Sequence, residues 1–173
     1  LGNYTLKTLT SGGNNIGIGH EAGKIITTGG SNIAIGSYAL NNADTESHNI
    51  AIGYDALGGA VAGATFNVIM GNYAGDALTS GSSNIGIGYQ ALSGTAAGSQ
   101  NTAVGHQALF STGDKNNNTA VGYTALYSAT TGGNNTALGY EAGYGFDTES
   151  HNTAIGYRAF RQQGGDHNTA IGA

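Results

Sequence analysis

The chain has 173 residues, of which 32 are glycine and none is proline or cysteine, and its formal net charge is −5. The lack of cysteine excludes disulfides and cysteine metal sites. Its five lysine and arginine residues are too few to bind a nucleic-acid backbone. No run of about 18 apolar residues is present, so we expect no membrane insertion in this segment. Collagen is excluded because it needs proline, and the frequent, regularly placed apolar residues argue against disorder.

One short phrase recurs along the whole chain, and its clearest copy is NTAIGYRAF at residues 152–160. Each copy begins with an asparagine, and successive asparagines are 17, 17, 18, 17, 17, 17, 17, 17 and 16 residues apart. These asparagines are Asn15, Asn32, Asn49, Asn67, Asn84, Asn101, Asn118, Asn135, Asn152 and Asn168. A fixed short period is typical of a solenoid, in which each coil contacts only its neighbours. We therefore predict that residues 1–173 form a single β-solenoid repeat array.

The array begins and ends in the middle of a repeat. Leu1-Gly2 matches Ile18-Gly19 at a shift of 17 residues, and the last residues, Ile171-Gly172-Ala173, fall within the tenth copy. We expect the sequence to be a window of a longer protein.

With the asparagine as position zero, positions zero to four alternate in character, which predicts a strand. Positions one and three share a face and are mostly β-branched, as a packed sheet surface favours. The opposite face carries the asparagine, then mostly alanine or glycine, then a glycine in all ten copies. We predict that the asparagines stack as an amide ladder. The invariant glycine indicates a positive φ or a steric limit at a corner.

A second short strand is predicted at positions five to eight. Position seven is alanine in every complete copy, from Ala22 to Ala159, which indicates a buried site with room for one methyl group. Position six varies widely and indicates a solvent-facing side. Position eight is Leu40, Leu57, Leu92, Leu109, Leu126 or Phe160, and glycine in the other three copies. By alternation we expect these leucines to point outward and to form an apolar stripe that needs a cover.

Such a thin coil should not be stable alone. We expect its core to hold one isoleucine, one alanine and a half-buried neighbour, whose burial contributes roughly a few kcal/mol. Ordering the backbone costs roughly 1–2 kcal/mol per residue. Side-by-side association of identical chains around the long axis would supply the missing buried area and align every column with itself.

Two sets of phrases resemble known repeats. NIAIG at 32–36 and NTAIG at 152–156 resemble the head repeat of trimeric autotransporter adhesins of the YadA type, and NTAVGYTAL at 118–126 is similar to repeats of bacteriophage tail fibres. The resemblance covers nearly the whole chain. Together with the 17-residue spacing of the asparagines, which is longer than the usual repeat of the autotransporter heads, it implies an all-β, left-handed parallel β-roll in a homotrimeric fibre. It also implies an extracellular location, on a cell surface or a virion tail fibre, with sister chains and a host-cell glycan or protein receptor as partners.

Two loops carry acidic residues beside histidine. Asp44-Thr45-Glu46-Ser47-His48 recurs as Asp147-Thr148-Glu149-Ser150-His151. Carboxylates beside an imidazole could hold a divalent cation. The alternative, which we favour, is a solvated turn that ends before the asparagine. We therefore assign no catalytic, cofactor-binding or metal residue to the chain, and expect no cofactor.

Position five carries an aromatic column, made of Tyr54, Tyr89, Tyr123, Tyr140 and Tyr157 with His20 and His106. Such a column could stack against sugars of a host glycan. It could equally pack beside the alanine of position seven and seal the groove between chains. We favour packing, because aromatic rings with polar tips suit half-wet interfaces.

Three functions follow from these patterns. The first is the structural shaft or head of an extracellular trimeric fibre that provides reach and adhesion. The second is an ice-binding face formed by the threonine column from Thr102 to Thr169, against which the isoleucines and valine of the first half count. The third, ranked last, is a glycan depolymerase with carboxylate pairs between chains. Because the acidic residues lie singly in loops, we expect no enzyme activity.

Overall fold

The protein is a rod of stacked coils with one parallel sheet along its side. The computed structural model describes residues 1–111, 113–162 and 164–173. Each coil contributes one three-residue strand to a ten-stranded sheet, whose order in space follows the chain. The strands are β1 (Ile16–Ile18), β2 (Ile33–Ile35), β3 (Ile50–Ile52), β4 (Val68–Met70), β5 (Ile85–Ile87), β6 (Thr102–Val104), β7 (Thr119–Val121), β8 (Thr136–Leu138), β9 (Thr153–Ile155) and β10 (Thr169–Ile171).

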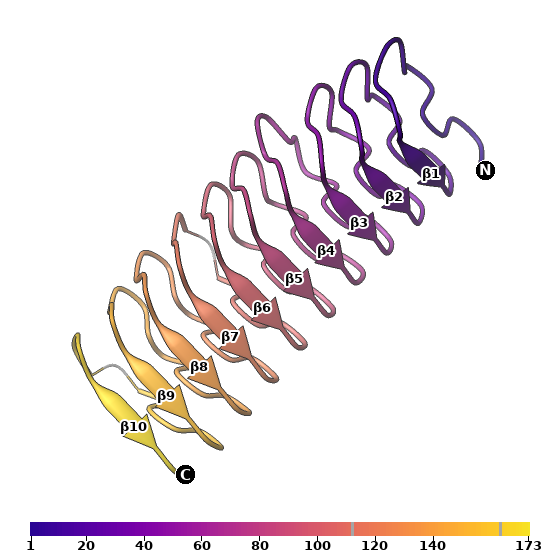
Figure 1. Ribbon diagram of the computed structural model, residues 1–173. Coiled ribbons are helices and arrows are strands. Elements are labelled where there is room, and N and C mark those ends of the chain that lie inside the picture. The colour runs from indigo at the N-terminus through magenta and orange to yellow at the C-terminus, as the bar shows by residue number, and fades with distance from the viewer. Residues whose placement is uncertain (112, 163) are drawn as a thin grey trace.

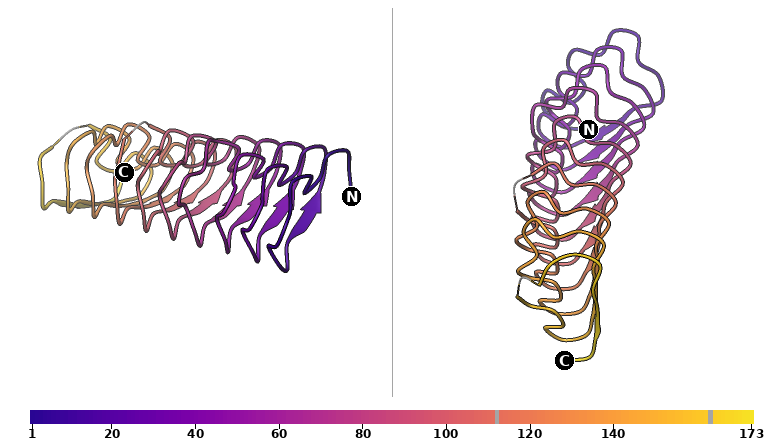
Figure 2. Two further views of the ribbon diagram at one scale, coloured as in Figure 1. Left: turned by 90° about the horizontal axis from the view of Figure 1, so that it is seen from above. Right: turned by 90° about the vertical axis from the view of Figure 1, so that its left-hand side faces the viewer.

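Every strand pairs in parallel with the next one, position for position. Ile16 lies beside Ile33, for example, and Thr119 beside Thr136. Figure 1 shows the ten strands side by side in chain order, and Figure 2 shows the coils stacked along one axis from end to end. The predicted all-β solenoid of about 17-residue coils is thus confirmed.

None of the described residues belongs to a helix, and accordingly none forms a helix able to cross a membrane.

The core lies behind the small-residue face of the strands. Position two is fully buried in most coils, as at Ala34, Ala51 and Ala120, whereas positions one and three are half-exposed or exposed in every strand. The expectation that an isoleucine of each strand would fill the coil is therefore wrong. The interior is narrow, so it takes alanine from the strand and leaves the larger β-branched side chains outside.

The predicted second strand does not form, because its backbone is left-handed at two of four positions. Positions six and eight have positive φ in every complete copy, as at Tyr38 (64°) and Leu40 (49°). A strand needs negative φ throughout, so these residues form a tight turn instead. Period-two alternation predicts that the leucines of position eight point outward. The turn does not follow this alternation.

The leucine column consequently points into the core, and the predicted outward stripe of leucines is wrong. The residues Leu40, Leu57, Leu92, Leu109 and Leu126 are all 0% exposed. Position eleven adds further buried side chains, among them Ile26, Leu78 and Phe146. Each coil therefore buries more apolar surface of its own than the sequence led us to expect, and the single chain has a continuous core.

The glycine of position four marks a corner where neighbouring coils touch through their backbones. In all ten copies its φ lies between 127° and 140°. From Gly19 to Gly156, a Cβ atom would lie only 2.0–2.6 Å from the carbonyl oxygen of the glycine in the next coil. Both explanations offered for the invariant glycine, a positive φ and a steric limit, are thus confirmed.

The asparagine ladder is confirmed and also closes each coil. From Asn32 to Asn168, the backbone N–H of each asparagine donates to the side-chain Oδ1 of the previous one, at 2.8–3.0 Å. The Nδ2 group of each asparagine from Asn15 to Asn152 donates to a carbonyl near the end of its own coil, at 2.7–3.0 Å. Each asparagine side chain thus fixes the distance to the neighbouring coil and the point at which its own coil closes.

The alanine of position seven is buried as predicted, with no exposed surface from Ala22 to Ala142 and 5% at Ala159. We expect Ala125→Leu to lower the free energy of unfolding by at least about 1–3 kcal/mol, because the close-packed core must shift to admit three further carbon atoms. Thermal or urea unfolding would measure the loss. Val121→Leu is the matched control, since Leu138 already occupies the same outward position. Equal stability of the two variants would contradict a tightly filled interior.

Candidate functional site

Because the interior of the rod is filled, its candidate binding features lie outside. The first is the apolar face, which we define as positions one and three of β1 to β10. The exposed members include Ile16 (49%), Ile18 (42%) and Leu138 (47%), and the remaining apolar members are half-exposed or exposed. In the last five strands position one is threonine, in register from Thr102 to Thr169. The face is a two-column surface that runs the length of the sheet.

The second feature is an aromatic ladder beside this face. It contains one ring from each of ten successive coils, with neighbouring centroids 5.0–6.2 Å apart. The rings belong to Tyr4, His20, Tyr38, Tyr54, Tyr73, Tyr89, His106, Tyr123, Tyr140 and Tyr157. Seven of these are the predicted column, and the structure brings all seven together.

Sequence reasoning missed three rings of the ladder. Tyr4, Tyr38 and Tyr73 stand at position six, which we interpreted as an unrelated variable column. A signal was present: in those coils position five is Asn3, Ser37 or Asn72, so positions five and six together hold one ring in each coil. The left-handed backbone at position six lets a ring there meet rings at position five of the neighbouring coils.

The ladder changes geometry along the rod. From Tyr4 to Tyr89 adjacent rings meet edge to face, with interplanar angles of 65–90°. From Tyr89 to Tyr157 they stack, with angles of 7–24°. Many of the rings remain well exposed, for example Tyr123 at 46%. Besides their neighbours in the ladder, some rings contact cationic side chains, as Tyr4 does with Lys7 at 4.8 Å and Tyr157 with Arg158 at 5.2 Å.

The two acidic loops use their carboxylates internally. The Glu46 side chain is 6% exposed and accepts hydrogen bonds from the backbone N–H groups of Asp44, Thr45 and Gly63, at 2.8–3.0 Å. Asp44 accepts the hydroxyl of Thr27. A solvated turn is therefore the wrong description of the glutamate, which is buried and binds backbone N–H groups of its own loop and of the next coil.

The second loop repeats this arrangement. Glu149 accepts from the backbone N–H groups of Asp147 and Thr148 at 2.7 and 3.0 Å, and Asp147 accepts the hydroxyl of Thr130. The loop histidines stack on neighbouring rings, His48 on Phe66 at 4.9 Å and His151 on His167 at 4.7 Å. Over the part of the chain that the structure describes, no three histidine, aspartate or glutamate side chains converge to hold a metal ion.

One ion-pair cluster lies near the last coils. Glu141 Oε2 accepts from Nε of Arg158 at 2.9 Å and from Nε of Arg161 at 2.6 Å. Burial would raise the pKa of Glu141, but the hydrogen bonds from the two arginines outweigh it and lower the pKa. The pKa of Tyr140 is raised, first by its hydrogen bond with Glu141 and then by burial.

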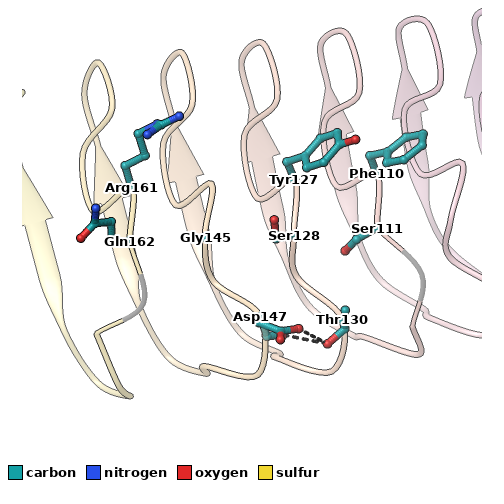
Figure 3. A pocket seen from close by; sticks show the side chains of 9 residues that line it. All are labelled: Phe110, Ser111, Tyr127, Ser128, Thr130, Gly145, Asp147, Arg161 and Gln162. Carbon is teal, nitrogen blue, oxygen red and sulfur yellow. Dashed lines mark hydrogen bonds between the residues drawn. The ribbon is translucent and has the colours of Figure 1, made fainter.

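The third feature is a side groove of about 850 Å³ that crosses four successive coils (Figure 3). Its lining residues are Phe110, Ser111, Tyr127, Ser128, Thr130, Gly145, Asp147, Arg161 and Gln162. The rings of Phe110 and Tyr127 stack at 5.1 Å, and Tyr127 stacks on Tyr144 at the same distance. The Arg161 guanidinium then lies 5.3 Å from the Tyr144 ring. Sequence reasoning did not identify this groove, because position nine is aromatic in only three coils.

A buried lysine supports the floor of the groove. Lys115 is 1% exposed, and its Nζ donates to the carbonyl oxygens of Ser111 and Ala129, at 2.5 Å each. Burial lowers the pKa of Lys115 to about 8, although the charge of Asp114 acts in the opposite direction. At the same position the flanking coils carry Gly98 and Gly132, so no sequence pattern marks this lysine as buried.

No family model, curated protein or solved structure matches the chain. The fold and the three outward features are therefore the basis of the functional argument.

The buried lysine predicts a pH dependence of stability. Between pH 8 and pH 10.5 the unfolded state still binds the Lys115 proton while the folded state has released it, so raising the pH favours folding. We expect the contribution of Lys115 to the free energy of unfolding to rise by about 1.5 kcal/mol from pH 8 to pH 9.5. The measurement compares urea unfolding of the wild type and Lys115→Met at both pH values. Lys7→Met, at an exposed lysine, is the control, and an identical pH response of all three proteins would contradict the prediction.

Proposed function

We propose that the chain is the structural shaft or head of an extracellular fibre in which three copies wind around a common axis and provide reach and adhesion. The single observation that supports this is the apolar face. It points outward and continues over ten strands, and none of the residues that the structure describes covers it. An apolar surface of this length would be a liability on an isolated soluble rod.

The identity of the face changes the argument for assembly. The leucines of position eight are inside, so the surface to be covered is formed by β-branched residues of the strands. Because the coils are in register, a second copy related by rotation about the long axis would place each column against an equivalent column. The aromatic ladder flanks this face, and its half-exposed rings suit the partly wet edge of such an interface.

The fibre role combines this assembly with repetition. A rod made of identical coils separates two ends by a fixed distance, and its outward loops are presented many times. Weak contacts of such loops with a host-cell glycan or protein would add through multivalency. The left-handed winding and the membership among YadA-type adhesins or phage tail fibres are part of the same proposal, supported by the repeat phrases.

Solution mass tests the assembly directly. Sedimentation equilibrium should give three times the chain mass of 17.2 kDa. We expect the double variant Ile52→Glu, Ile87→Glu to give the single-chain mass, because both charges would be buried without partners in the interface. The control is Thr131→Glu, Thr148→Glu, which places the same charges on exposed loops. A single-chain mass for the wild type at all concentrations would refute the fibre assembly.

A second candidate function is favoured by one specific observation. The threonines from Thr102 to Thr169 lie outward, in register and on the same face as the valine, leucine and isoleucine column. A regular array of hydroxyl and methyl groups is suited to ordering water into an ice-like layer. Purified protein would then produce thermal hysteresis, and Thr119→Lys, Thr136→Lys would abolish it. No hysteresis at millimolar concentration would remove this candidate.

A further inference from the structure

The side groove differs from the rest of the surface in its construction. Its floor is position ten, which is serine or glycine at Ser111, Ser128 and Gly145. One wall is the ring stack of position nine, and the opposite wall is formed by Thr130 and Asp147, whose hydrogen bond Figure 3 shows. Small floor residues between two taller columns leave an open channel that runs along the rod.

This construction is confined to the last four complete coils. In earlier coils position nine is Lys24, Asn41, Gly58, Asp76 or Ser93, so no aromatic wall is present. The first acidic loop nevertheless keeps the same threonine–aspartate hydrogen bond, between Thr27 and Asp44. The wall of rings is thus a local addition to a common scaffold.

The groove is also held rigid. Arg161 fixes the end of the ring stack through its contact with Tyr144 and its 2.6 Å hydrogen bond to Glu141. Lys115 binds the carbonyls of Ser111 and Ala129 from below the floor. A site whose walls are fixed before binding loses little conformational entropy when a ligand enters.

The polar groups of the groove suit an uncharged ligand rich in hydroxyls. Asp147 accepts from Thr130 through one carboxylate oxygen, which leaves its second oxygen as an acceptor. Arg161 donates to Glu141 through its Nε, so the terminal guanidinium nitrogens remain as donors to a ligand. The negative charge of Asp147 and the positive charge of Arg161 offset each other, which favours neither an anionic nor a cationic ligand.

The apolar groups point to the same ligand. The stacked rings of Phe110 and Tyr127 line the channel with their centroids 5.1 Å apart, a spacing comparable to the length of one sugar ring in an extended chain. Sugars offer alternating C–H and hydroxyl surfaces, which match an apolar wall opposite a wall of oxygen atoms.

We propose that the side groove binds a short segment of a neutral glycan, laid along the axis of the rod. This inference deepens the adhesive role proposed above and rests on it. Every chain of a three-chain fibre would contribute a copy of this groove, and the weak affinities of the three copies would add on a surface that displays many glycan chains.

The test is titration of the full chain with neutral oligosaccharides of four to six sugars, namely cello-, malto-, manno- and xylo-oligosaccharides, followed by calorimetry and by NMR. We expect at least one series to bind in the micromolar to millimolar range. Tyr127→Ser should weaken that binding at least about tenfold; serine is acceptable there because Ser93 occupies the same position of an earlier coil. Asp147→Asn should have a similar effect, because the remaining carboxylate oxygen becomes an amide donor.

The repeated acidic loop supplies the matched control. Asp44→Asn makes the same change beside the same threonine contact, but away from the groove, and should leave the affinity unchanged. Equal losses in Asp44→Asn and Asp147→Asn, or no binding of any of the four series by the wild type, would overturn the proposal. Binding of charged oligosaccharides alone would overturn it as well.

Sedimentation of the same samples separates this proposal from the fibre assembly. A three-chain wild type that binds no oligosaccharide refutes the groove and leaves the assembly intact. A single-chain wild type that binds through Tyr127 and Asp147 refutes the assembly and leaves the groove intact.

Discussion

The structure depends on the hydrogen bonds of one buried asparagine in each coil. Its Oδ1 accepts the backbone N–H of the next asparagine, and its Nδ2 donates to a carbonyl near the end of its own coil. The first contact sets the register between coils, and the second sets the length of the loop that returns to the strand. Where the repeat is one residue longer, after Asn49, the acceptor moves from the fourteenth to the fifteenth residue and the ladder continues. The asparagine hydrogen bonds therefore fix where each coil closes, whereas the loop between the strand and the closing carbonyl can vary in length.

The features that could be predicted from the sequence are those that every repeat must share. The asparagines, the corner glycines and the alanines of position seven are nearly invariant because each meets an identical neighbour in the next coil, and one misfit would interrupt the stack. Their spacing alone predicted the parallel solenoid, the amide ladder and the buried methyl column. The unbroken glycine column also predicted the corner, where φ is positive and a Cβ atom would collide with the carbonyl of the next coil, as at Gly36.

Features that depend on backbone conformation within the turn could not be predicted from periodicity. Alternation assumes extended residues, but Tyr38 and Leu40 are both left-handed, a conformation that side chains with a Cβ adopt at some cost. That single difference turned the leucine column inward and moved the exposed apolar surface to the strands. Lys115 was missed for another reason: burial of its charge depends on two carbonyl groups, of Ser111 and Ala129, that only the folded loops bring together.

The division between a uniform inside and a variable outside explains how such a rod can acquire function. Substitutions at the inner columns affect every neighbour, whereas the residues at positions five, six, nine and ten differ from coil to coil. A ring can move from position five to six, as at Tyr38, and the ladder persists. Aromatic residues at position nine of three successive coils form one wall of the groove, because the in-register stacking of the coils places their rings above one another. Aligned repetition thus converts a few neighbouring substitutions into a continuous surface, and a long recognition site needs no change to the fold.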